Sequence, residues 1–208
     1  MVEEKIKKTL SGFLDARSVH QTHFDIRTFL AVEISDKAIK EITNLQETLT
    51  KKLKFVGKII EPENLHITLK FFGEITPQEI EKIDEILKKV EFPEIKAKLG
   101  RTGIFTYNNQ PKIIWVKIEG NLTKIQKIID KQLEPLFKLE QKFMSHLTIA
   151  RIKYVNDVKY ALEYIKNIKL PKIEFEIKSI KLQSSKLTPI GPVYTTLKEY
   201  KSTNPIKS

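Results

Sequence analysis

The chain contains no cysteine among its 208 residues. That absence excludes a disulfide scaffold, a cysteine-ligated zinc or iron–sulfur site and a thiol nucleophile, and it favours a reducing compartment. No apolar run approaches the roughly 18 residues that a membrane-spanning helix needs. The acidic Glu3 and Glu4 stand where a secretory signal would carry only positive charge. We therefore expect a cytoplasmic protein with no membrane segment.

Arginine is also scarce, although the chain is strongly basic. It has 37 basic and 26 acidic residues and a formal net charge of +11, yet only four of the basic residues are arginine. A basic balance suits a polyanionic partner such as nucleic acid. A lysine-rich surface can equally serve as a solvated coat. Charge alone leaves both interpretations open.

The hydrophobic pattern repeats once along the chain. A strand-like run at 28–34, a helical period at 36–54, an alternating strand at 65–73 and a helix from 77 form the first unit. The second unit has a strand at 113–118, a helix after Asn121, an alternating strand at 144–151 and a helix at 157–168. We therefore predict an α+β fold in which duplicated β-α-β-α units form one bilobal domain. Two antiparallel sheets would line a central cleft, with the helices outside.

Residues 27–200 carry this pattern, including two strands predicted on either side of 188–192. Residues 1–26 do not join the repeat, and we expect them to form an N-terminal extension outside the core. Residues 201–208 are expected to form a C-terminal tail.

Two of the four histidines stand in the same short motif. The sequence His-Ile-Thr-Leu begins at position 66 and His-Leu-Thr-Ile begins at position 146, at equivalent points of the two units. Alternate side chains of a strand share a face, so His66 and Thr68 would point into the cleft together, as would His146 and Thr148. Two imidazoles and two hydroxyls suit an acid, a base and two donors around a tetrahedral anion. By the same alternation, Lys70 shares the face of His66 and would add positive charge.

Two other interpretations of these histidines stay open. A histidine on an alternating strand is often an ordinary polar residue with its hydrogen bonds satisfied. The pair could instead bind a metal, but such pairs usually need a third protein ligand, and no Asp or Glu shares the face of either strand. We expect no metal.

The paired motifs make the chain resemble the 2H phosphoesterases, and specifically the RNA 2',3'-cyclic phosphodiesterases, also known as 2'-5' RNA ligases. The resemblance covers residues 27–200 and includes the opening run at 27–33 and the closing segment at 185–194. In this family the first motif extends to a phenylalanine and the second to an arginine. Phe71 and Arg151 stand at those positions.

The positions of Phe71 and Arg151 raise a geometric question. Each lies five residues after its histidine, so a regular strand would turn it away from the histidine's face. Either each strand ends or bulges after the threonine, or the side chains reach around a sheet edge. We favour an end or a bulge for Arg151, because burying its charge in the core would be costly. For Phe71, stacking on a base and core packing with Phe72 exposed are both open.

The resemblance implies a metal-independent cyclic phosphodiesterase that uses no cofactor. Water would attack the phosphorus of a 2',3'-cyclic phosphate and the P–O3' bond would break, leaving a 2'-phosphate. The residues alone do not distinguish the acid from the base. The site residues implied are His66 as proton donor, His146 as proton acceptor, Thr68, Thr148 and Arg151 as phosphate ligands, and Phe71 and Lys70 as base or backbone contacts.

The expected partner is RNA with 2',3'-cyclic phosphate ends, tRNA fragments included, and the protein is taken to be a monomer. In reverse, with a 5'-hydroxyl in place of water, the same groups would join RNA through a 2'-5' bond. No ATP would be needed, and the chain has neither a P-loop nor a Lys-x-Asp-Gly motif. Two alternatives remain open: a noncatalytic module that binds RNA ends, and a 2H phosphoesterase that acts on another cyclic nucleotide.

Overall fold

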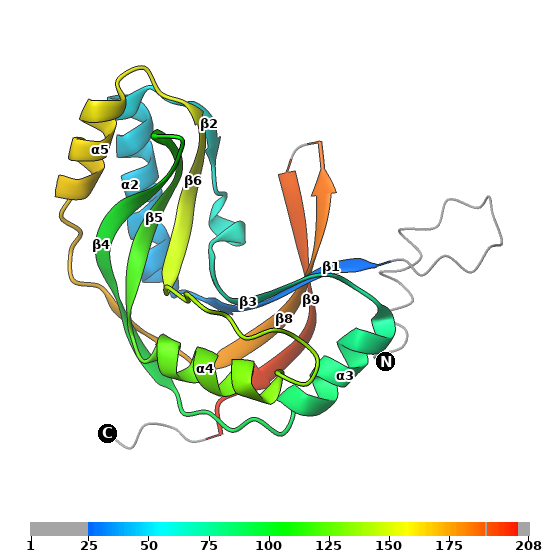
Figure 1. Ribbon diagram of the computed structural model, residues 1–208. Coiled ribbons are helices and arrows are strands. Elements are labelled where there is room, and N and C mark those ends of the chain that lie inside the picture. The colour runs from blue at the N-terminus through cyan, green and yellow to red at the C-terminus, as the bar shows by residue number, and fades with distance from the viewer. Residues whose placement is uncertain (1–24, 190, 204–208) are drawn as a thin grey trace, which may run out of the picture.

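The computed structural model describes residues 25–189 and 191–203, which form two antiparallel sheets with helices on their outer sides (Figure 1). In chain order the elements are β1 (Ile26–Glu33), α2 (Asp36–Leu53), β2 (Val56–Ile59), a 3-10 turn η1 (Pro62–Asn64), β3 (His66–Ile75), α3 (Pro77–Leu87), β4 (Ile95–Tyr107), β5 (Gln110–Gly120), α4 (Leu122–Gln132), β6 (His146–Tyr154), α5 (Val158–Asn167), β7 (Glu174–Ile177), β8 (Ser179–Thr188) and β9 (Gly191–Lys201). Sheet 1 has the strand order β3-β1-β8-β9, and sheet 2 has the order β2-β6-β5-β4-β7. The predicted α+β class with two antiparallel sheets is confirmed.

Local sequence signals define the helix starts. The Ser35 side chain caps α2, and the Asp157 side chain caps α5. Thr76 and Glu79 form a reciprocal capping box at α3, where proline occupies the first helical position. Asn121 precedes α4 as predicted, but its side chain makes no capping hydrogen bond.

The helices that follow equivalent strands cross to opposite sheets. α2 follows β1 of sheet 1 but packs on sheet 2, where the buried Gln46 amide donates to the Ile149 carbonyl of β6 at 2.8 Å. α4 follows β5 of sheet 2 but packs on sheet 1, where Asp130 forms an ion pair with Lys70 of β3. Figure 1 shows α2 and α5 beside sheet 2, with α3 and α4 near sheet 1. The two units therefore interlock, since each supplies a helix to the other's sheet.

The strands outside the repeat complete the sheets. β8 pairs with β1, so the C-terminal hairpin finishes sheet 1, and β4 pairs with β5 in sheet 2. The edge strands β2 and β7 were not predicted from the sequence. β2 shows no clear alternation, whereas β7 alternates, with Phe175 and Ile177 buried, but spans only four residues.

At both ends the described strands extend slightly beyond the predicted core of residues 27–200. Residues 1–24 of the expected extension and 204–208 of the expected tail lie outside the described residues. Ile26 already belongs to β1, and Lys201 still belongs to β9. The next two backbone N–H groups, of Ser202 and Thr203, donate to carbonyls of residues 178 and 92. Over residues 25–189 and 191–203, no helix has both the length and the apolar character needed to cross a membrane.

Candidate active site

β3 and β6 carry matching bulges directly after their threonines. Along β3, Leu69 falls between two consecutive residues of β1 and has no register partner. Along β6, Ile149 does the same opposite β5. One extra residue reverses the alternation of side chains, so Phe71 and Arg151 return to the face that carries the two histidines. The structure therefore contains a bulge after each threonine, which is one of the two arrangements that the sequence left open.

Hydrogen bonds from α2 and from the residue after β2 hold the bulge in β6. The Ile149 carbonyl accepts the Ile60 N–H at 3.0 Å and the Gln46 amide at 2.8 Å. The same amide nitrogen donates to the Ile60 carbonyl at 2.8 Å. These bonds satisfy backbone groups that a bulge would otherwise leave unpaired.

Phe71 lies in the cleft and not in the core. Its side chain is 52% exposed, and the Arg27 guanidinium lies 4.9 Å from its ring centroid. Phe72 instead packs against Phe137, with ring centroids 4.8 Å apart. The core-packing alternative for Phe71 is therefore wrong.

Lys70 does not share the cleft face of His66, so that prediction is wrong. The bulge that turns Phe71 outward turns Lys70 inward, where it is 5% exposed and forms an ion pair with Asp130. Its ammonium group also donates to the Lys138 carbonyl at 2.8 Å. Lys70 contacts the helix layer and is not a base or backbone contact of the cleft.

The two histidines are held in the same way. His66 Nδ1 lies 2.8 Å from the Asn64 carbonyl, and His146 Nδ1 lies 2.7 Å from the Met144 carbonyl. A carbonyl can only accept, so each Nδ1 carries the hydrogen and donates it. Nε2 of each ring is then the nitrogen left to give or take a proton.

His66 has an enclosed, positively charged environment. Its ring lies 4.9 Å from the Phe29 ring and 5.1 Å from the Tyr194 ring, between centroids. Burial lowers the pKa of His66 below its usual 6.5, and the nearby Arg151 charge lowers it further, although the hydrogen bond to the Asn64 carbonyl opposes both effects. In the ligand-free protein the neutral imidazole is favoured.

A cavity of about 430 Å³ lies at the first motif and extends to Arg151 of β6. Its lining includes His66, Thr68 and Phe71 from β3 together with Arg151 from β6. Its volume falls within the roughly 300–1,000 Å³ of small-molecule sites. His146 and Thr148 are not part of this lining. They lie on β6 ahead of Arg151, where the Phe105 ring meets the His146 ring edge-on at 5.2 Å.

Several cavity residues had no role in the sequence-based prediction. Arg27 and Tyr194 lie within the segments that carry the family resemblance, but no pattern indicated that they line a cavity. Lys58 comes from the unpredicted strand β2. Asn64 acts through its backbone carbonyl, so its side-chain type gives no signal.

Within the described part of the chain, no group of three or more His, Asp or Glu side chains could hold a metal ion. The hydroxyls of Thr68 and Thr148 make no hydrogen bond to any residue of 25–189 or 191–203. Both are therefore available to donate to a bound anion.

A family model described as LigT like Phosphoesterase matches the chain twice, at residues 32–115 and 116–194. The chain belongs to this family. Each match contains one of the two histidine motifs, so the LigT-like assignment confirms the resemblance to 2H phosphoesterases and the expected enzyme class.

Curated relatives of this LigT-like phosphoesterase align with most of its length. An RNA 2',3'-cyclic phosphodiesterase of Methanocaldococcus jannaschii is 41% identical over 179 residues, covering 84% of this chain and 100% of the relative. One from Thermotoga maritima is 34% identical over 180 residues, covering 84% of this chain and 94% of the relative.

Solved structures share the fold. A protein of Thermus thermophilus superposes with a TM-score of 0.69 at 23% identity, covering 86% of this chain and 100% of that one. Escherichia coli LigT complexed with 3'-AMP superposes with a TM-score of 0.68 at 17% identity, covering 86% of this chain and 99% of that one.

Proposed function

We propose that this LigT-like phosphoesterase hydrolyses 2',3'-cyclic phosphate ends of RNA to 2'-phosphates by two-histidine acid and base catalysis. The observation that carries the proposal is the matched pair of bulged strands. Each strand begins with a histidine whose Nδ1 donates a hydrogen bond to the carbonyl two residues earlier, which leaves Nε2 for proton transfer. The names of the curated relatives support the same substrate.

The reaction needs a base on one side of phosphorus and an acid on the other. His146 Nε2 takes a proton from water while the water oxygen bonds to phosphorus. The P–O3' bond breaks on the opposite side, and His66 Nε2–H gives its proton to O3'. The O2'–P bond stays intact, so the product is a 2'-phosphate and a free 3'-hydroxyl.

The charge that develops on the nonbridging oxygens is stabilised by donors from both strands. Arg151 and Thr68 line the cavity, and Thr148 occupies the place on β6 that Thr68 occupies on β3. Donors that are fixed before the reaction stabilise a transition state without the cost of reorganisation. Thr68, Thr148 and Arg151 are therefore the proposed phosphate ligands, with Phe71 against the base.

His66 must carry a proton when the substrate is bound. Burial and Arg151 lower its pKa in the free protein. A bound phosphate anion acts in the opposite direction, because an opposite charge within about 4–6 Å favours the protonated imidazole. Substrate binding therefore helps to protonate the acid.

The same groups would also catalyse joining. With the 5'-hydroxyl of a second RNA in place of water, attack at phosphorus gives a 2'-5' phosphodiester and the same O3' leaving group. The phosphoanhydride of ATP is not needed, because the cyclic diester is already strained and activated. RNA ends, including those of tRNA fragments, are the proposed partners.

Product analysis tests the reaction directly. The protein is incubated with an oligoribonucleotide ending in a 2',3'-cyclic phosphate, and the product is identified by phosphorus NMR. A 2'-phosphate is expected. A 3'-phosphate, or no turnover, contradicts the proposal.

Variants test the two histidines. His66→Ala and His146→Ala are each expected to lower turnover by a factor of about 10²–10⁴, with RNA binding retained in fluorescence anisotropy. Tyr160→Ala is the matched control, since Tyr160 lies exposed on α5, on the outer side of sheet 2. Activity within a few-fold of wild type in either histidine variant would exclude the mechanism. Turnover is expected to be unchanged in EDTA.

A further inference from the structure

A second aromatic and cationic surface lies on sheet 2 beside His146, outside the cavity. It consists of Arg101 and Phe105 on β4 and Trp115 and Lys117 on β5, and we call it the sheet-2 platform. The strand register places it on the cleft side, because Lys117 pairs with His146 and Trp115 pairs with Thr148.

Close packing between β4 and β5 forms the platform. Trp115 lies flat across Gly103 of β4, where a Cβ atom would come within 2.2 Å of the indole ring. Only glycine leaves room for the ring in this position. The Arg101 guanidinium lies 5.2 Å from the Trp115 ring, and Phe105 lies 5.5 Å from it, between centroids. Trp115 is thus covered and is only 5% exposed, while Phe105 keeps 38% of its surface exposed.

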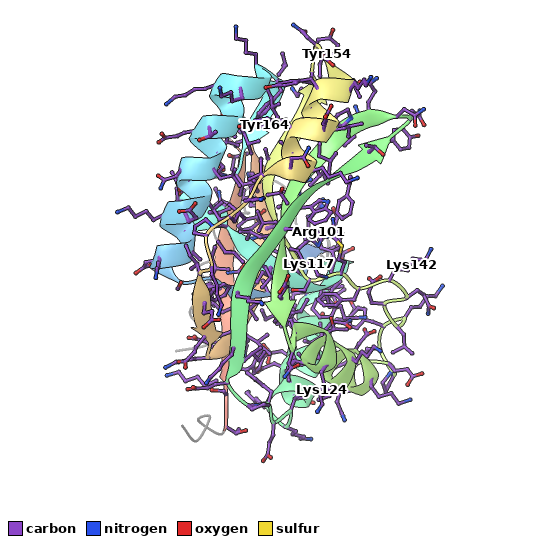
Figure 2. All side chains as sticks on the ribbon, turned by 90° about the vertical axis from the view of Figure 1, so that its left-hand side faces the viewer. Arg101, Lys117, Lys124, Lys142, Tyr154 and Tyr164 are labelled. Carbon is purple, nitrogen blue, oxygen red and sulfur yellow. The ribbon has the colours of Figure 1, made fainter. Side chains whose placement is uncertain are left out.

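The cations of the platform are available for a ligand. Neither Arg101 nor Lys117 forms an ion pair with any residue of 25–189 or 191–203. In Figure 2 these two side chains lie close together, and Lys142 projects from the loop that follows α4.

An exposed ring flanked by unpaired cations fits single-stranded nucleic acid. Bases stack on aromatic side chains while lysine and arginine bind the phosphates, and such stacking tolerates any base. An acidic protein segment would use the cations but would have no need of the ring. Phe105 also contacts the ring of His146, so a nucleotide stacked there would lie next to the reacting phosphorus.

The geometry of the displacement at phosphorus determines which nucleotide would stack on the platform. The attacking oxygen and the leaving O3' lie on opposite sides of phosphorus. The ribose and base of the cyclic phosphate stay with O3', on the side of His66, where the cavity offers Phe71 and Arg27. His146 takes the proton of the attacker, so its neighbours face the attacking group.

We propose that the sheet-2 platform binds the nucleotide whose 5'-hydroxyl attacks in ligation. This inference rests on the proposed function and its assignment of His146 as the base. In hydrolysis the platform stays empty, because water is the attacker. The platform would therefore set the ratio of joining to hydrolysis and leave hydrolysis itself unchanged.

The test uses one tube with a donor oligoribonucleotide ending in a 2',3'-cyclic phosphate and an acceptor with a 5'-hydroxyl. Joined and hydrolysed products are measured together, and hydrolysis of a mononucleoside 2',3'-cyclic phosphate is measured separately. Phe105→Ala and Arg101→Gln are each expected to lower the ratio of joined to hydrolysed product about fivefold or more. Hydrolysis of the mononucleotide by Arg101→Gln is expected to stay within about twofold of wild type.

A matched variant on the other side of the cleft completes the design. Phe71→Ala is expected to slow joining and hydrolysis alike, because it removes a contact to the donor nucleotide. Arg101 is exposed, and its guanidinium lies over the Trp115 ring. If Phe105→Ala fails to fold, Arg101→Gln alone decides the test.

The acceptor assignment is overturned if Arg101→Gln and Phe105→Ala leave the product ratio unchanged, or if they slow mononucleotide hydrolysis as much as joining. It is also overturned if the wild-type protein hydrolyses the donor but never joins it. A wild-type protein that does not turn over any cyclic phosphate would instead refute the proposed function.

Discussion

Replacing Lys70 by methionine should destabilise the protein strongly, because it leaves a buried charge without its partner. Lys70 and Asp130 are 5% and 4% exposed, and they join β3 of sheet 1 to α4. Removing one member of a buried ion pair costs about 3–5 kcal/mol. The total free energy of unfolding of a domain is only about 5–15 kcal/mol. Lys70→Met is therefore expected to lose a large part of the stability.

The double variant Lys70→Met/Asp130→Leu separates the lost charge from the lost pair. Replacing both members of a buried pair by apolar residues is often neutral or stabilising. Two further hydrogen bonds are lost, from Lys70 to the Lys138 carbonyl and from the Glu140 N–H to Asp130. At about 0.5–1.5 kcal/mol each, they should leave the double variant roughly 1–3 kcal/mol below wild type. It should nevertheless be more stable than the single variant.

Urea unfolding followed by circular dichroism measures all three proteins. Lys181→Met is the matched control, because its ion pair with Glu33 lies at the surface and should contribute only about 0–1 kcal/mol. A Lys70→Met variant within about 1 kcal/mol of wild type, or a double variant less stable than the single one, would refute the reasoning. The same pair holds the segment that leads to Met144, whose carbonyl orients His146. The double variant should therefore fold but turn over cyclic phosphate more slowly.

Three further predictions follow from the site and the sheets. Because His66 is the proposed acid and must keep its proton, kcat/KM should fall as the pH rises through the pKa of His66, which burial and a neighbouring guanidinium lower below the usual 6.5. In kcat this fall should come at a higher pH, because bound phosphate raises that pKa, and a kcat/KM that does not fall until well above pH 6.5 would contradict this. Gln46→Leu should lower the free energy of unfolding by about 1–3 kcal/mol, since the Ile60 carbonyl loses the Gln46 donor and the Ile149 carbonyl keeps only the Ile60 N–H. Gln126→Leu should be neutral, because the Gln126 amide nitrogen has no partner within the described residues, and equal losses in the two variants would refute the comparison. Gly103→Val should lower the Tm by several degrees and shift the Trp115 fluorescence, since the new side chain occupies the place of the indole; an unchanged emission spectrum would argue against that packing.

The sequence was sufficient for local structure and for the paired motifs. Helix starts follow from side chains that bond to nearby backbone groups, as at Ser35 and Thr76. The alternation of β3 and β6 also predicted the cleft face up to each threonine. These features depend on residues a few positions apart, so a single sequence displays them.

The features that the sequence did not reveal depend on contacts between distant segments. Whether Lys70 points to the cleft or to the core depends on one unpaired residue, Leu69, and a bulge is defined by the partner strand. The alternation therefore misplaced Lys70 although it placed Thr68 on the right face. The crossing of α2 and α4 to opposite sheets was equally hidden, because Gln46 and Ile149 lie 103 residues apart.

The two motifs are nearly identical in sequence, yet their surroundings differ, and the proposed mechanism gives the two histidines different roles for that reason. His66 is enclosed by Phe29 and Tyr194, beside Arg151, and it lines the cavity of about 430 Å³. A histidine in such a place gains its proton when an anion enters, so it suits the acid that meets O3'. His146 lies instead beside Phe105 and the sheet-2 platform, where an attacking hydroxyl can approach. In the proposed mechanism, acid and base therefore differ in what each strand faces and not in the motif itself. Replacing a residue that encloses His66, such as Phe29, should therefore raise the pKa of His66 toward its usual value, because burial is the main cause that lowers it.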